Sequence, residues 1–353
     1  MKANFSDVRI AGILGVVPKN TSYFDDEVAN YSHSTSNSKK LKSLMGYGEH
    51  RVVKSGVTTS DLAIHGLNML FLDYGVDVKK IDAIFFISQT PDYVLPATSS
   101  YIHGKFAFLK DTYCVDINDG CNGYIKGLYE AGAFLSATNS QMVLLIAGDV
   151  LSPKISINDR NSYPLVGDAV TITLVEKAKN SPMEIEIFND GTGYDKLMIP
   201  AGGARMQSNL TTKIATTDDD GNARNLEQLV MQGRDVFTFT QTVIPEFIDN
   251  FLKCRYLSKE SIDLFILHQA NVFILDRIRA RLKIIAEKLP DEVVKKFGNS
   301  SSATIPLSII ESYEDHKKNK ILTCGFGVGL SWGAALFSLE NLKFSVITEY
   351  IGE

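Results

Sequence analysis

The sequence lacks the cysteine patterns that mark disulfide-rich proteins and zinc proteins. Its 353 residues contain only four cysteines, which are Cys114, Cys121, Cys254 and Cys324. None of them belongs to a Cys-x-x-Cys pair, and their separations match no zinc-binding spacing. The pattern therefore argues against a disulfide framework and against a structural metal. A cysteine with a special role must act alone.

The chain also lacks long apolar runs and a strong excess of charge. No stretch approaches the roughly 18 uninterrupted apolar residues of a transmembrane helix, so we expect no membrane span. Residues 1–18 have no charged region followed by a continuous apolar one, as a secretory signal would, and we expect a cytoplasmic protein. The formal net charge of -5 argues against nucleic-acid binding, which usually needs a basic surface.

What is present is the composition of an ordinary globular protein and a faint internal duplication. Hydrophobic residues make up 44% of the chain, enough for a large core. Residues 58–86 and 227–267 each read as an amphipathic helix followed by a buried strand entered by Ile-Asp. Alternating strands and helices predict mainly parallel sheets covered by helices, here in two similar α/β halves. Chance similarity of generic helix–strand units is the alternative.

The two copies continue in parallel. Helices are expected to begin near Cys121 and near Ser302, and the separation of Cys121 from Asp82 equals that of Ser302 from Asp263. Two apolar strands follow each expected helix. Between the copies, residues 210–225 are polar, charged and without periodicity, which predicts an exposed loop.

Cys121 stands between a polar turn at residues 116–120 and the predicted amphipathic helix. The unpaired backbone N–H groups and the macrodipole at a helix N-terminus favour negative charge. They lower a thiol pKa and make a nucleophile available at neutral pH. The alternative is a buried packing residue, which is what most free cysteines are.

Two polar residues of the second half lie at the ends of apolar segments. His268 comes directly after an apolar strand, and ligand-contacting residues gather at the carboxyl ends of parallel strands. A hydrogen-bonded structural histidine is the alternative. Asn299 lies in a Gly-Asn-Ser turn before an apolar helix, where capping of that helix is the simplest role.

Glycines recur at positions 325, 327, 329 and 333. The spacing fails the Gly-x-Gly-x-x-Gly pattern of dinucleotide sites, because Leu330 stands where the third glycine is needed. Alternate glycines instead let the backbone approach a ligand closely, and an N–H group there can face a developing oxyanion.

Taken together, these segments resemble the β-ketoacyl-acyl carrier protein synthase III family of the thiolase-like condensing enzymes. The resemblance spans nearly the whole chain. The stretches that carry it are VRIAGILGVVP, MGYGEHRVV, TPDYVLPATSS, the Cys121 segment, VGDAVTITLV, MQGRDVFTFT, HQAN, FGNSSSATIPLSI and FGVGLSWGAALF. It implies an α/β, thiolase-like fold in which two similar βαβαβ-type halves pack in a layered α-β-α-β-α arrangement. Residues 1–180 would carry the nucleophile, and residues 181–353 the histidine and the asparagine.

The resemblance implies an acyltransferase that needs no metal or redox cofactor. Cys121 would take an acyl group from a thioester of coenzyme A or of an acyl carrier protein. His268 and Asn299 would then act as neutral donors to the enolate that forms when a malonyl thioester loses carbon dioxide. The backbone N–H groups of Cys121 and Gly329 would form the oxyanion hole. Because the family forms homodimers, we expect a homodimer.

Thiolases proper use a second cysteine in the terminal glycine loop. That second cysteine aligns with Gly325, one residue after Cys324. A one-residue offset along a strand turns a side chain to the opposite face. Cys324 is therefore interpreted as a packing residue. The order Cys, His, Asn also occurs in papain-like proteases, which lack the glycine loop and the duplicated organisation.

The chain departs from the family where substrates would enter. Residues 39–42 are Lys-Lys-Leu-Lys where a tryptophan often stacks on the adenine of coenzyme A. Phe273 replaces an arginine that often follows HQAN, and Leu95 replaces an aromatic residue that partners often insert into the neighbouring pocket. The smaller Leu95 leaves room, so an unusual or longer primer than acetyl is expected. The residues expected to contact substrate are Arg160, Met231, Phe237, Leu95, Asn271 and Phe273.

Basic residues crowd the helix predicted after HQAN, where they would dock an acidic carrier protein. They are Arg277, Arg279, Arg281 and Lys283. A solvated basic face is the alternative.

Asp116 and Asp119 are unexpected beside a thiolate, because nearby carboxylates raise the pKa of a thiol. We expect both side chains to lie in a loop that points away from the sulfur. If either side chain faced the sulfur, it would act as an acid or base in a non-decarboxylative reaction.

The function predicted for the chain is a step of fatty acid biosynthesis. An acyl group on Cys121 is extended by decarboxylative Claisen condensation with a malonyl thioester, giving a β-ketoacyl product. The alternative keeps the acyl-Cys121 intermediate but transfers the acyl group to an amine or alcohol in a specialised pathway. A third possibility is a non-catalytic partner subunit that keeps the fold.

Overall fold

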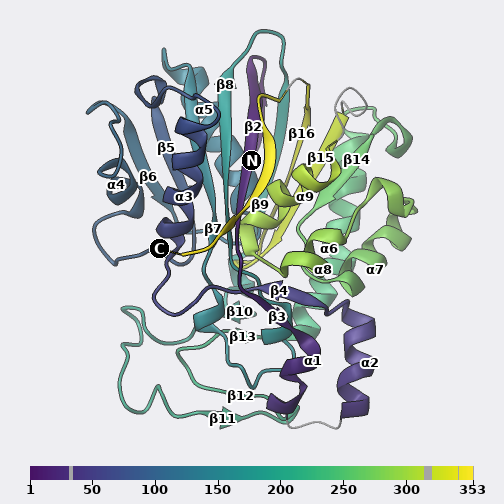
Figure 1. The fold of residues 1–353 in the computed structure, drawn as a ribbon. Helices are drawn as coiled ribbons and strands as arrows, with labels where there is room; N and C mark the ends of the chain where they lie inside the picture. Colours follow the sequence, from purple (N-terminus) through teal and green to yellow (C-terminus); the bar gives the residue numbers. More distant parts are fainter. Residues whose placement is uncertain (32–34, 314–319, 341, 353) are drawn as a thin grey trace.

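Two sheets flanked and separated by helices form the body of the molecule, as a computed structural model of residues 1–31, 35–313, 320–340 and 342–352 shows (Figure 1). The first sheet has the strand order β17-β2-β8-β7-β5-β6, and the second β1-β9-β16-β15-β14. Their strands are β1 (Lys2–Phe5), β2 (Val8–Pro18), β5 (Ala83–Ile87), β6 (Tyr113–Ile117), β7 (Met142–Asp149), β8 (Ala169–Lys177), β9 (Met183–Asn189), β14 (Leu264–Leu267), β15 (Lys320–Gly327), β16 (Ser331–Ser338) and β17 (Ser345–Tyr350).

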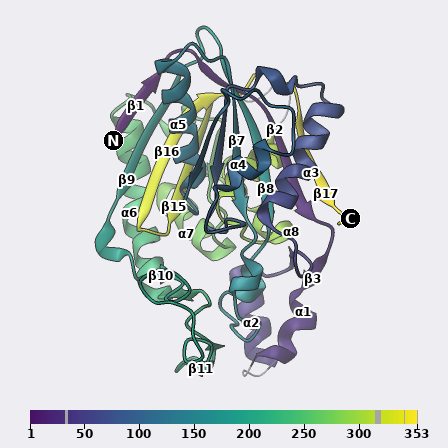
Figure 2. The same cartoon turned by 90° about the vertical axis from the view of Figure 1, so that its left-hand side faces the viewer.

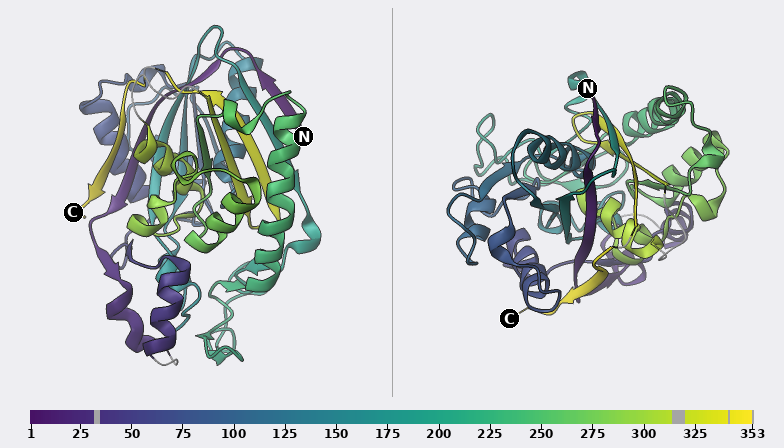
Figure 3. Two further views of the ribbon diagram at one scale, coloured as in Figure 1. Left: turned by 90° about the vertical axis from the view of Figure 1, so that its right-hand side faces the viewer. Right: turned by 90° about the horizontal axis from the view of Figure 1, so that it is seen from above.

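Helices occupy three layers. Those of the body are α3 (Thr59–Leu72), α4 (Thr98–His103), α5 (Gly123–Ala137), α6 (Gly233–Lys253), α7 (Val272–Leu282), α8 (Glu292–Phe297) and α9 (Thr304–Ser312). α3 and α4 pack on the outer face of the first sheet, and α6 and α7 on the outer face of the second (Figure 3). α5 and α9 contribute to the core between the sheets. The predicted α-β-α-β-α layering is confirmed.

Local sequence accounts for these elements. All five residues of β5 are buried, as expected for a parallel strand covered on both faces. α3 begins with a capping box, in which the N–H of Thr58 donates to Asp61 at 2.9 Å. The N–H of Ile274 donates to the Asn271 side chain at 2.8 Å, which caps α7.

The duplicated order is present in the fold. α3 leads to β5 as α6 leads to β14, and α5 and α9 begin just after Cys121 and Ser302. The ends of the chain cross between the sheets, because β1 pairs with β9 and β17 pairs with β2. The boundary at residue 180 stays a prediction.

A smaller lobe extends beyond one end of the sheets (Figure 2). Its elements are β3 (Thr21–Tyr23), α1 (Phe24–Glu27), α2 (Thr35–Met45), β4 (Glu49–Arg51), β10 (Leu197–Met198), β11 (Thr216–Thr217), β12 (Ala223–Arg224) and β13 (Val230–Met231). The segment predicted as an exposed loop is mostly exposed, but it contains the β11–β12 hairpin. Arg224 anchors it through ion pairs with Asp159, at 2.6 Å, and with Asp218. Within the described residues, no helix is long and apolar enough to cross a membrane.

Candidate active site

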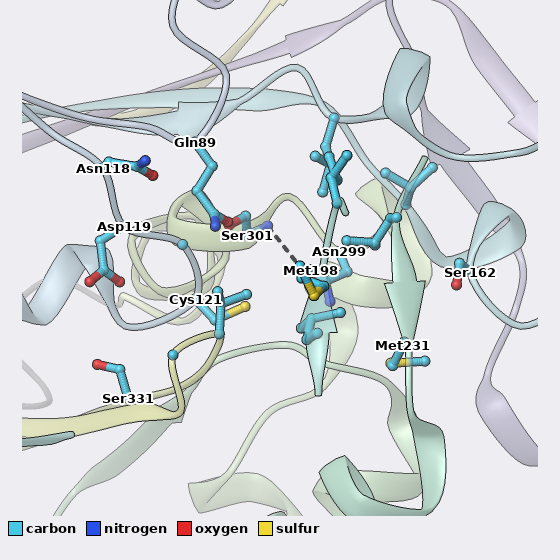
Figure 4. A pocket seen from close by; sticks show the side chains of 18 of the residues that line it. Gln89, Asn118, Asp119, Cys121, Ser162, Met198, Met231, Asn299, Ser301 and Ser331 are labelled. Atoms are coloured by element: carbon cyan, nitrogen blue, oxygen red, sulfur yellow. Dashed lines mark hydrogen bonds between the residues drawn. The ribbon is translucent and has the colours of Figure 1, made fainter. Parts of the chain in front are cut away.

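A cavity of about 480 Å³ brings together loops from both halves of the chain (Figure 4). Cys121 enters it from the turn before α5, and Asn299 and Ser301 from the turn before α9. Val328 and Gly329, between β15 and β16, close another side. The cavity thus joins the cysteine, the asparagine and the glycine loop that are distant in sequence.

The Cys121 thiol is subject to opposing influences. Burial raises its pKa to about 12, and the carboxylates of Asp119 and Asp149 act in the same direction. The backbone polar groups of Val328 and of Cys121 itself act in the opposite direction and lower the pKa. Burial therefore outweighs the expected effect of the helix terminus. The thiol must lose its proton as a thioester binds.

Val328, one residue before Gly329, supplies the second N–H group at the sulfur. Gly329 also lines the cavity, with φ at +133°. Sequence reasoning missed Val328, because residues 328–330 form a turn, and the direction of each N–H group in a turn is not set by the strand alternation that a motif reveals.

The alternate glycines make room for the turn that carries the nucleophile, rather than for a ligand as predicted. A Cβ atom at Gly327 would lie 2.8 Å from both Cβ and Sγ of Cys121. One at Gly325 would lie 2.8 Å from Cα of Asn122. Cys324, one residue before Gly325, is fully buried in the core under α6 and α7, which confirms it as a packing residue.

Gly327→Ala should slow acyl loading of Cys121 by about 10- to 100-fold, because the added methyl group displaces the nucleophile. Intact mass spectrometry of the acyl adduct over time measures the rate. Gly203→Ala is the matched control, since a Cβ atom there meets nothing within 4 Å. Equal loading by both variants would show that the close approach of residues 121 and 327 is unimportant.

His268 is buried beside the cavity and does not line it among the described residues. Its Nδ1 lies 2.7 Å from Oγ1 of Thr304, which donates to the Ser301 carbonyl at 2.9 Å. The ring packs edge-on against Phe326. Because Thr304 donates its one hydrogen to that carbonyl, its oxygen accepts from the ring, so Nδ1 of His268 carries the proton in this arrangement and Nε2 has the lone pair. Burial lowers the pKa of His268 to about 3, so the imidazole is neutral at neutral pH.

This pKa shift predicts that the stability of the fold falls in acid because the His268 imidazole becomes protonated. The folded-state pKa of about 3 lies below the ordinary value of 6.5. The contribution of His268 to stability is therefore complete above pH 6.5 and is lost as the pH falls toward 3. The unfolding free energy should fall by up to about 1.4 kcal/mol per pH unit more steeply in the wild type than in His268→Asn. Urea unfolding across this window measures both slopes, and identical slopes would contradict the prediction.

Asn299 is held from both halves of the chain. Its side-chain oxygen accepts from the N–H of Ser301 at 3.0 Å, as Figure 4 shows, and its amide nitrogen donates to the carbonyl of Ala270 at 3.3 Å. Its backbone N–H donates to Leu165 at 2.6 Å. The N-cap of α9 is Ala303, so Asn299 does not cap that helix. Its second amide hydrogen has no protein partner within the described part of the chain and is available to a ligand.

The two aspartates before Cys121 differ in orientation. Asp116 accepts from two backbone N–H groups at the start of α4, at 2.6 and 2.8 Å, and so points away as expected. Asp119 instead lines the cavity and pairs with Lys126 of α5, so the expectation that it points away is wrong. Lys126 lies one turn into α5, where the pairing draws the carboxylate to the same wall.

Of the residues expected to contact substrate, Met231 lines the cavity. The rings of Phe237 and Phe273 stack on each other at 5.3 Å, outside the described cavity lining. Asn271 caps α7, and Leu95 is 80% exposed.

Arg160 also lies outside that lining, with its backbone carbonyl accepting from Tyr47 at 3.4 Å.

The expected docking residues are not equivalent. Arg279 pairs with Asp276 and Asp291 and donates to the Leu289 carbonyl, so it is not an open docking cation. Arg277 is exposed and lies over the ring of Phe273. Arg281 and Lys283 are exposed.

The apolar wall of the cavity was not predicted, apart from Met231. It includes Leu151, Ile155, Val166, Leu197, Met198 and Leu229. These residues come from separate segments, and β10 and β13 bring Leu197 opposite Met231. No local pattern in the sequence marks such a set.

Comparison with known proteins agrees with this arrangement. The family described as 3-oxoacyl-[acyl-carrier-protein] synthase III matches residues 115–191, and its C-terminal family matches residues 252–339. The chain is 30% identical to the β-ketoacyl-[acyl-carrier-protein] synthase III of Rhodopirellula baltica, over 95% of this chain and 99% of that protein. It is 31% identical to the enzyme of the same name from Caldanaerobacter subterraneus, over 82% and 86%.

A solved structure, the 3-oxoacyl-(acyl-carrier protein) synthase of Burkholderia xenovorans, superposes with a TM-score of 0.90. It is 28% identical and covers 99% of each chain. With a relative of at least 30% identity along nearly its whole length, the chain belongs to the β-ketoacyl-[acyl-carrier-protein] synthase III family of thiolase-like acyltransferases.

Proposed function

We propose that the chain loads an acyl group onto Cys121 and extends it with a malonyl thioester, releasing carbon dioxide and a β-ketoacyl product. One observation carries the proposal. The Cys121 sulfur and the Val328 backbone beside it line the same cavity that the Asn299 amide enters from the other half of the chain. Acyl transfer and enolate stabilisation need these two kinds of donor side by side.

In the first step, the Cys121 thiolate attacks the thioester carbonyl of the incoming acyl donor. The carbonyl oxygen becomes negative and moves toward the N–H groups of Cys121 and Val328, which hold it in a buried site. The bond to the donor sulfur then breaks, and that sulfur leaves with the proton lost by Cys121. A thiolate suits this exchange because it both attacks and leaves readily.

In the second step, the malonyl thioester loses carbon dioxide, and the electron pair of the broken bond forms an enolate. Asn299 donates its free amide hydrogen to the enolate oxygen. His268 serves as the second neutral donor through Nε2–H, which requires the Thr304 hydroxyl to turn from the Ser301 carbonyl and donate to Nδ1. The enolate carbon attacks the acyl carbonyl on Cys121, a carbon–carbon bond forms, and the Cys121 sulfur leaves. The apolar wall around Met198 and Leu229 keeps water from the acyl-enzyme.

The test uses the purified full chain with butanoyl-coenzyme A and malonyl-coenzyme A, and with the corresponding carrier-protein thioesters. We expect an acyl adduct on Cys121, followed by equal amounts of carbon dioxide and β-ketoacyl product. Carbon dioxide without a condensed product would refute condensation. Transfer to an added amine or alcohol without malonyl thioester would identify the non-condensing alternative. The absence of any adduct would indicate a non-catalytic subunit.

We also propose that the chain acts as a homodimer, supported by its family membership and by the position of β6 at an edge of the first sheet. Light scattering of the purified protein tests this, and a mass of one chain at micromolar concentration would refute it.

A further inference from the structure

The cavity has two unlike ends on either side of Cys121. Figure 4 shows Gln89, Asn118 and Asp119 on one side of the cysteine. Met198 and Met231 lie on the other side. The first end also includes Lys126, so every side chain of this group is polar. The second end is mostly apolar. A substrate that spans the cysteine must match both.

Several groups at the polar end have unused hydrogen-bonding capacity. The carboxamides of Gln89 and Asn118 make no hydrogen bond to other described residues. The absence of a side chain at Gly120 leaves room for Gln89, whose Oε1 would lie 2.2 Å from an added Cβ atom. The ion pair of Asp119 with Lys126 also lines this end.

Ser301 provides an independent observation. It is only 4% exposed, lines the cavity, and has a positive φ of 56°, which is uncommon for a residue with a side chain. Burial raises the pKa of nearby Asp149 to about 6, and the Ser301 hydroxyl opposes that rise. Even so, Oγ of Ser301 makes no well-aligned hydrogen bond within the described residues. The hydroxyl thus interacts with the Asp149 carboxylate without a well-aligned bond, and its lone pairs stay available to a polar ligand group in the cavity.

From these groups we propose that the acyl primer is a short chain bearing a hydroxyl group, which the polar end of the cavity binds beyond Cys121. The inference rests on the proposed function, because it concerns the acyl group carried by that cysteine. A hydroxyl both donates and accepts, so it can bond to Gln89 and Ser301 together. An unbranched alkyl end of the same length would displace water from these groups and leave them unpaired.

The carrier arm is assigned to the apolar end for a separate reason. Met231 in the cavity wall leads directly into α6, and Phe237 of α6 stacks on Phe273 of α7. The exposed cation Arg277 lies over that ring. Together with the exposed Arg281 and Lys283, Arg277 forms a basic surface that suits an acidic carrier or a phosphorylated cofactor. The acyl group then extends to the opposite side of Cys121.

The experiment compares two probes of equal chain length, the butanoyl and 3-hydroxybutanoyl thioesters of N-acetylcysteamine. Because these probes lack a carrier, only the acyl end differs. Intact mass spectrometry follows adduct formation on Cys121 in the wild type, in Gln89→Leu and in the control Glu130→Gln. Glu130 lies on α5, as Lys126 does, but is not part of the cavity lining. Thermal unfolding of each variant confirms that it is folded.

We expect the wild type and Glu130→Gln to load the hydroxylated probe about tenfold faster than the butanoyl probe. The preference is modest because Asn118, at the same end of the cavity, is exposed to water. Gln89→Leu should lose most of this preference, measured as the ratio of the two loading rates. Equal loading of both probes by the wild type, or a preference for butanoyl, would overturn the polar-primer inference and leave the acyl-enzyme proposal standing. No adduct from either probe or from coenzyme A thioesters would overturn both.

Discussion

Cys121→Ala should abolish acyl loading and lower product formation by about 10⁴-fold or more, because the covalent intermediate then has no sulfur to form on. The loss should affect every thioester equally, since the change removes the nucleophile and not a binding contact. Intact mass spectrometry detects the adduct, and release of carbon dioxide measures turnover. The same protein should retain its fold, because the substitution removes one buried atom beside glycines.

Two other cysteines make matched controls. Cys254 is exposed, so Cys254→Ala removes a thiol that solution reagents reach more easily than Cys121. Cys324→Ala removes a second buried thiol near the same loop but on the opposite face of β15. Both variants should still form one acyl adduct. Persistence of the adduct in Cys121→Ala, or its loss in Cys254→Ala, would move the nucleophile elsewhere.

Asn299→Asp should separate the two steps of the reaction. An aspartate keeps the oxygen that accepts from Ser301 but loses the amide hydrogens, including the one proposed to reach the enolate. Condensation and carbon dioxide release should fall by about 10²- to 10³-fold, which corresponds to a barrier about 2.7 to 4 kcal/mol higher. Acyl loading of Cys121 should change far less, because the oxyanion of that step is held by backbone N–H groups.

Single-turnover loading and steady-state carbon dioxide release, measured on the same preparation, distinguish the two effects. Asn209→Asp is the control, since Asn209 is exposed and its oxygen likewise accepts from a backbone N–H, that of Thr211 at 2.8 Å. If Asn299→Asp lowers loading as much as carbon dioxide release, Asn299 supports the architecture of the cavity and is not specific to the second step.

The arrangement of the site gives each half of the chain a distinct task. The turn before α5 supplies the sulfur, and the equivalent turn before α9 supplies Asn299 and Ser301. The core between the sheets contains residues of both helices, so it fixes one turn relative to the other. A buried, rigid core of this kind is what keeps reacting groups within the small tolerances that catalysis needs.

The sequence by itself determined the features that depend on local pattern. Apolar runs and helical periodicity predicted the elements and their duplicated order, because burial of one face is written in residues that are close in sequence. The one-residue offset between Cys324 and Gly325 predicted that Cys324 faces a core and Gly325 the turn that carries the nucleophile, because side chains alternate along a strand. Ordered motifs were enough to predict the layered fold.

Tertiary structure alone decided which groups meet. The N–H of Val328 at the sulfur depends on how the turn after β15 is oriented, and the inward position of Asp119 depends on its pairing with Lys126. Arg279 is withdrawn from the surface by Asp291, which lies on a later segment. Burial of Cys121 raises a pKa that its helix terminus alone would lower. Such effects arise from contacts between distant segments and from the exclusion of water, and neither is encoded in any local stretch of residues.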